Sequence, residues 1–104
     1  MSRIISGLLS LLFVAGLANA AAAADAANGQ TLSKRWCAAC HVVASDQQRA
    51  NGQAAPFSAI GNLPGLDASK LALFLLVPHP KMPDMALSRA EAADIAAYIA
   101  TQGK

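Results

Sequence analysis

The sequence is poor in cysteine, in charge and in aromatic side chains. Its 104 residues contain two cysteines, one Trp, one Tyr and three Phe, and 13% of them are charged. Because the cysteines stand only three positions apart, a disulfide between them would restrain little of the unfolded chain. The eight Lys and Arg nearly balance the six Asp and Glu, which excludes the dense basic face of a nucleic-acid-binding protein. The length suits one domain rather than two.

A basic start, an apolar run and small residues follow one another at the beginning of the chain. Arg3 precedes the apolar run 4–18, and Ala18 and Ala20 stand at the two positions that a signal peptidase reads. The run is shorter than the ~20 apolar residues of a spanning helix, so we expect cleavage rather than a retained membrane anchor. We therefore predict a signal peptide at 1–20, with Ala24 as the latest cleavage site, a flexible lead-in at 21–27 and a domain at 28–104.

Three helices and no strand are predicted in this domain. The first starts at Ala26 or Asn28 and ends at Ala39. The second covers 68–76, between a capping Asp67 and Pro78, and is apolar nearly all round, which predicts burial on most sides. The third follows the capping-box spacing of Ser88 and Glu91 and ends before Gly103. A loop of roughly 25 residues separates the first two helices, and such a length in a small domain indicates that it wraps around something.

The residues Cys37-Ala38-Ala39-Cys40-His41 carry the chemistry. Two cysteines three apart at a helix end match the vinyl groups of haem, and the histidine that follows can reach the iron, so the pattern is a c-type haem attachment signature. A thioredoxin-like dithiol is a weaker alternative, because that fold needs strands. A zinc site that adds His79 is another, but the adjacency of Cys40 and His41 makes shared coordination awkward. A haem would also complete the core of a domain of about 80 residues with few large apolar side chains.

On these residues the sequence resembles the class I c-type cytochromes, in particular small bacterial periplasmic ones with one haem. The resemblance extends over Gly29, the Trp36-to-Val43 segment, Ala55-Pro56-Phe57, the Pro78-to-Pro83 segment and a terminal helix with Tyr98. It implies an all-α cytochrome c fold with three main helices and long loops wrapped around one covalent haem c, attached to Cys37 and Cys40.

The resemblance also implies the ligands of the iron. His41 is the ligand on one side, and Met82 is the expected ligand on the other, with Met85 as its main rival and His79 as a third candidate. The backbone carbonyl of Pro56 is expected to accept a hydrogen bond from the ring of His41.

The remaining expectations concern packing. Gly29 is expected to permit a close crossing with the last helix near Tyr98. Ser33 departs from the family, in which an aromatic residue is common at this position, so Leu32 or Trp36 is expected to take over its packing. The side chains expected to pack around the porphyrin or between the helices are Trp36, Phe57, Leu71, Phe74 and Tyr98.

These expectations define a periplasmic carrier of single electrons and not an enzyme. With His and Met on both sides of the iron, no position is open for a substrate, and a thioether ligand raises the reduction potential. The expected partners are redox proteins that dock transiently to a monomer, aided by Lys34, Arg35 and Lys81 if the partner is acidic. A dedicated subunit of a dehydrogenase or oxidase complex remains an alternative, and a haem enzyme or gas sensor is a less favoured one.

Overall fold

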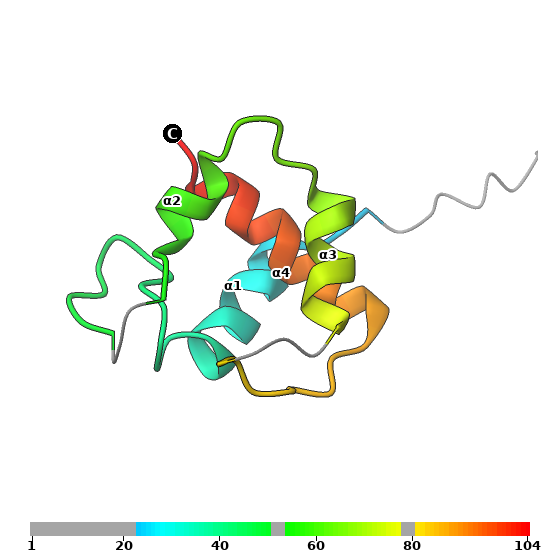
Figure 1. Cartoon of the computed structure of the whole chain (residues 1–104), viewed down its shortest axis with the longest axis horizontal. Coiled ribbons are helices and arrows are strands. Elements are labelled where there is room, and N and C mark those ends of the chain that lie inside the picture. The colour runs from blue at the N-terminus through cyan, green and yellow to red at the C-terminus, as the bar shows by residue number, and fades with distance from the viewer. Residues whose placement is uncertain (1–22, 51–53, 78–80) are drawn as a thin grey trace, which may run out of the picture.

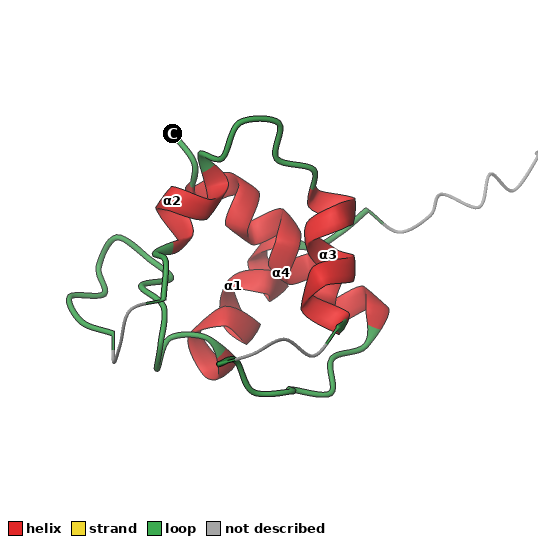
Figure 2. Ribbon diagram, in the orientation of Figure 1, coloured by secondary structure: helices red, strands yellow, loops and turns green. Residues whose placement is uncertain are grey.

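The computed structural model describes residues 23–50, 54–77 and 81–104, and this part of the chain is helical without a strand. It contains four helices, α1 (Ala26–Trp36), α2 (Phe57–Gly61), α3 (Ala68–Leu76) and α4 (Arg89–Gln102) (Figures 1 and 2). The predicted all-α class is confirmed, and α2 is an additional short helix inside the long loop. None of the described helices combines the length and the apolar character that crossing a membrane requires.

Helix α1 begins at Ala26, one of its two expected starts, and ends earlier than expected. The side chain of Asp25 accepts a hydrogen bond from the Asn28 N–H at 3.0 Å, so Ala26 and Ala27 are helical and do not belong to a flexible lead-in. The predicted end at Ala39 is wrong by three residues. The Cys37 N–H makes an ordinary helical bond to the Ser33 carbonyl, but the Ala38 N–H bonds to the same carbonyl five residues back, and this wider last turn ends the helix although two alanines follow.

Helices α3 and α4 have the predicted caps. Asp67 accepts from the N–H groups of Ser69 and Lys70, and α3 spans 68–76 as expected. Ser88 and Glu91 form a reciprocal capping box, with bonds of 3.0 and 2.9 Å, and start α4.

The polypeptide alone does not give the burial predicted for α3, since none of its residues is buried by other residues of the chain. Leu71 and Leu75 pack against the core, whereas Leu73 and Phe74 are 63% and 53% exposed. The reason is that α3 packs against α4 and against no other described helix.

Helix α4 is the centre of the fold. It contacts α1, α2 and α3, and no other pair of described helices meets (Figure 1). Its buried face joins the core cluster formed by Leu32, Cys37, Val43, Ala44, Phe57, Ile95, Tyr98 and Ile99.

The crossing of α1 and α4 depends on Gly29. A Cβ at this position would collide with the Asp94 carbonyl and the Tyr98 Cβ, so the predicted close crossing is confirmed. The carboxylate of Asp94 reinforces it by accepting from the Asp25 N–H at 2.7 Å and from the Asn28 side-chain amide at 2.9 Å. These bonds fix the position of the start of α1 relative to α4.

Candidate haem site

The two cysteines lie in a tight turn directly after α1. The N–H groups of Cys40 and His41 both bond to the Cys37 carbonyl, at 3.1 and 2.9 Å. Both thiols are free, but Cys37 is buried and Cys40 is exposed. Burial raises the pKa of the Cys37 thiol to about 11, and the nearby Ser33 hydroxyl opposes this shift in part. The Ser33 hydroxyl is itself buried and has no hydrogen-bond partner. The turn therefore anchors one sulfur in the core and leaves the other at the surface.

The ring of His41 is held from two sides. Its Nδ1 lies 2.6 Å from the Ala55 carbonyl, which can only accept, so Nδ1 carries the proton and Nε2 is left free to bind a metal. The Phe57 ring packs at a centroid distance of 5.4 Å. The expectation that the Pro56 carbonyl is the acceptor is wrong by one residue. That carbonyl accepts from the N–H groups of Ala59 and Ile60, because Pro56 caps α2.

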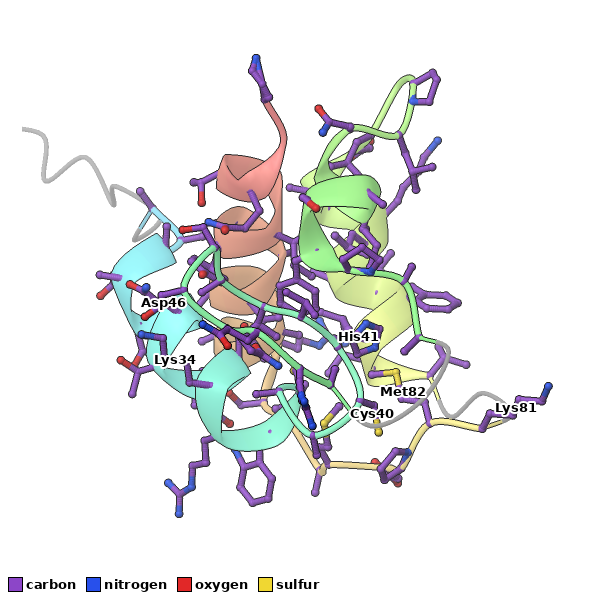
Figure 3. All side chains as sticks on the ribbon, turned by 90° about the vertical axis from the view of Figure 1, so that its left-hand side faces the viewer. Lys34, Cys40, His41, Asp46, Lys81 and Met82 are labelled. Atoms are coloured by element: carbon purple, nitrogen blue, oxygen red, sulfur yellow. The ribbon has the colours of Figure 1, made fainter. Side chains whose placement is uncertain are left out.

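Two cavities adjoin this turn. The larger, of about 260 Å³, is lined by both cysteines, His41, Trp36, Met82, Met85 and neighbouring residues. The smaller, of about 60 Å³, reaches inward between Phe57, Leu71 and Phe74. Cys37, His41 and Met82 line both cavities, and Figure 3 shows Cys40, His41 and Met82 on one side of the molecule. The two cavities therefore lie next to each other, between the attachment turn and Met82.

The smaller, inner cavity lies between the turn after α1 and helix α3. Helices α1 and α3 do not contact each other, although residues of the turn after α1 and residues of α3 line the same inner cavity. The two thiols at the turn could form thioether bonds to a haem, and the imidazole nitrogen and the methionine thioether could ligate its iron. The residues present thus fit this group.

Comparison with known proteins supports the same group. The profile of the Cytochrome c family matches residues 26–103. The chain belongs to the cytochrome c family. It is 52% identical over 93 residues to the cytochrome c-552 of Bradyrhizobium diazoefficiens, with 89% of each chain covered. No solved structure gave a significant match.

Membership of this family makes the protein a haem-based electron carrier and not an enzyme. It carries one covalent haem c, and the Cys37 and Cys40 of the Cys-x-x-Cys-His sequence supply the two cysteines for its attachment. The predicted family, fold and cofactor are confirmed.

Among the described residues, no group of three or more His, Cys, Asp or Glu side chains is placed to hold a metal ion. Cys37, Cys40 and His41 therefore do not converge as the zinc alternative requires. His79, the further ligand in that alternative and the third candidate for the haem iron, lies outside the described residues, as do Pro78 and Pro80.

The aromatic residues named from the sequence take different positions. Phe57 and Tyr98 are buried in the core, where their rings meet edge to face at 6.2 Å. Phe74 lines the inner cavity while half exposed. Trp36 borders the larger cavity but is 45% exposed under the Arg35 guanidinium, whereas Leu32, the other residue expected to compensate for Ser33, belongs to the core cluster.

Sequence reasoning missed two residues of the site. Ala55, with the acceptor for His41, was obscured because a backbone carbonyl leaves no mark in residue identity. Gln47 contacts the attachment turn through its side-chain amide, and a single polar residue in a loop carries no pattern that would reveal this.

Proposed function

We propose that the protein is a periplasmic carrier of single electrons whose haem iron is ligated by His41 and Met82. When bound, the haem would supply a one-electron iron couple. The chain would hold His41 by the Ala55 carbonyl and would present the Met82 thioether from the loop before α4. With both axial positions filled by side chains, no substrate or gas would have direct access to the iron.

The observation that carries the choice of Met82 is its position in both cavities. Met85 lines only the larger cavity, whereas Met82 also faces the inner space shared with Cys37, His41 and Phe74. Lys81 precedes it with φ of 71°, a left-handed conformation that non-glycine residues rarely adopt. Figure 3 shows the Lys81 side chain leading away from the site, whereas Met82 and His41 line the same two cavities.

Replacing each methionine by alanine tests this ligand assignment. The ferric wild-type protein should show the weak long-wavelength absorption of sulfur bound to iron, and Met82→Ala should lose it. The reduced Met82→Ala protein should also bind carbon monoxide, which the wild type should not. Met85→Ala is the matched control and should resemble the wild type. Loss of the band in Met85→Ala and its survival in Met82→Ala would reverse the assignment.

The processing and location of the chain form part of the same proposal. We expect residues 1–20, or up to 24, to be removed during export to the periplasm, leaving a monomer without a membrane span. Intact-mass analysis of the periplasmic fraction from a host that attaches haem would check this, since the mass should equal the shortened chain plus one haem. Retention of the full-length mass in the membrane fraction would contradict it.

The partners are proposed to be redox proteins that dock briefly near the exposed Cys40. Lys34 and Arg35 occupy the last turn of α1, and Lys81 precedes Met82 and lines the larger cavity, so cations lie on the two segments that flank the site. An acidic partner would be attracted, and its rate of electron exchange should fall as salt screens these charges. A rate independent of ionic strength would exclude this role for the three cations.

A further inference from the structure

One side chain, that of Gln47, ties the loop after His41 back to the attachment turn. Its Oε1 accepts from the Val43 N–H at 2.9 Å. Its Nε2 lies 2.9 Å from each of three carbonyls, those of Ala38, His41 and Arg49. A primary amide has two N–H hydrogens, so two of these carbonyls share one of them. The amide orientation is defined by its partners, because only the oxygen can serve Val43 and only the nitrogen can serve the carbonyls.

These bonds enclose the part of the chain that carries the chemistry. Ala38 lies between the two cysteines, and Val43 lies two residues after His41. The backbone before Cys40, at His41 and after it is thus bonded to one planar group that is itself half-buried. Without Gln47, four backbone groups would need other partners, and a turn with unpaired polar groups rearranges to find them.

The contribution of Gln47 to the site is indirect. It lines neither of the two cavities next to His41 but borders the opposite side of the turn, with Lys34 and Arg49. The ring of His41 is oriented by Ala55, while the main chain from which the ring projects is held by Gln47. The two contacts together restrict both ends of the His41 side chain.

We propose that Gln47 is a positioning residue that fixes the orientation of His41 toward the haem iron. The proposal rests on the ligand role proposed for His41. It predicts that losing the Gln47 amide changes the geometry of the ligand in the folded protein, in addition to any loss of stability.

Two variants of the haem-loaded protein, Gln47→Ala and Gln47→Glu, separate the parts of the contact. The alanine removes all four bonds, whereas the glutamate keeps an acceptor for the Val43 N–H and places a carboxylate against the three carbonyls. The neighbouring Gln48 is exposed, so Gln48→Ala is the matched control. The readouts are the NMR shifts of the haem methyl groups in the ferric state, which report the orientation of the axial imidazole, the reduction potential, and amide hydrogen exchange.

We expect both Gln47 variants to shift the haem methyl signals and the reduction potential, and Gln48→Ala to shift neither. Exchange of the Val43 amide should become roughly tenfold faster in Gln47→Ala, as the loss of one hydrogen bond implies, and should change less in Gln47→Glu. The amide of Ala92, which is buried in α4 away from Gln47 and bonds to the Ser88 carbonyl at 2.9 Å, is the internal reference for unfolding outside the turn. Variants that unfold more easily but keep the wild-type haem signals and potential would overturn the proposal and leave Gln47 a purely stabilising residue.

A second measurement uses the wild-type protein, so it does not require that the variants fold. The side-chain amide hydrogens of Gln47 should exchange at least tenfold more slowly than those of Gln48, and equal rates would overturn the proposal. Failure of the underlying function has a different signature. A wild-type protein without covalent haem, or without histidine on the iron, would refute the proposed ligation itself, whatever the two glutamines show.

Discussion

Replacing Tyr98 by phenylalanine removes one oxygen from the core and should cost about 2 kcal/mol of unfolding free energy. The Tyr98 hydroxyl donates to the Val43 carbonyl at 2.6 Å, and both residues are buried. Phenylalanine keeps the ring and its edge-to-face contact with Phe57, so hydrophobic burial is preserved. The loss is therefore that of a buried acceptor left without its donor, about 1–3 kcal/mol. In a domain of this size, 2 kcal/mol corresponds to a fall of about 8–16 °C in Tm.

Urea unfolding of the haem-loaded protein, followed by circular dichroism, measures this change. The midpoint should fall while the slope stays constant, because the surface exposed on unfolding is the same. Thr101→Val is a suitable control, since it removes a hydroxyl that bonds to the Tyr98 carbonyl in a more exposed place. A loss below about 0.5 kcal/mol in Tyr98→Phe, the range of ordinary surface changes, would refute the importance of this bond.

The effect of Tyr98 should also depend on pH. Burial, aided by the charge of Asp46, raises the pKa of the phenol above its ordinary value of about 10, and Gln30 opposes this in part. Because the folded-state pKa is the higher one, the stabilisation is complete below pH 10 and is lost as the pH rises through the folded-state pKa. The difference between wild type and Tyr98→Phe should therefore be constant near neutrality and shrink in alkali. If the difference in unfolding free energy between wild type and Tyr98→Phe grew in alkali instead, the predicted direction of the pKa shift would be contradicted.

Three further changes test the packing and the N-terminal cap of α4 by the same unfolding measurement. Gly29→Ala should cost about 1–3 kcal/mol, because the added Cβ meets backbone atoms of α4 that cannot move aside cheaply, and unchanged stability would refute the close crossing. Ser33→Ala should raise stability by about 0.5–1 kcal/mol, since it removes a fully buried hydroxyl without a hydrogen bond; a marked loss would show that the hydroxyl has a partner. Bonds from Ser88 hold the pKa of Glu91 below its ordinary value, so its contribution should be complete above about pH 4.5 and be lost as the pH falls through the folded-state pKa. Glu91→Gln keeps an acceptor without titrating, so its stability should vary less with pH over that range; equal acid dependence would exclude this role for the cap.

The parts of the fold that depend on local residue patterns could be predicted from the sequence. Asp67 and Ser88 cap α3 and α4 through bonds to residues two or three positions on, so the signal and the contact coincide in the chain. Gly29 was identified for a different reason: its contacts in α4 are distant in the sequence, but only a residue without a side chain lets two helices approach so closely.

The sequence-based predictions failed where the local structure is determined by a backbone group or by a residue distant in the sequence. The Ser33 carbonyl ends α1 by accepting from two N–H groups, and alanine at 38 and 39 gives no sign of that. The choice of Ala55 rather than Pro56 beside His41 depends on where α2 starts, and that short helix has no periodic pattern. The apolar sequence of α3 indicated burial, but its environment is set by which helices reach it, and only α4 does.

The arrangement around α4 divides the contacts of the site into two groups. The attachment turn follows α1, and the segment that leads to Met82 follows α3, yet these two helices meet only through α4. On one side, Tyr98 of α4 reaches Val43 and, through Phe57, the ring of His41. On the other side, α3 packs against α4 and offers Leu71 and Phe74 to the inner cavity. A haem attached at the turn and ligated from the Met82 loop would therefore join two halves that the polypeptide itself links through a single helix. Changes at Tyr98 or Gln47 should therefore act mainly on His41, whereas changes in α3 should act on the inner cavity that Met82 lines, so the two proposed ligands can be tested by separate mutations.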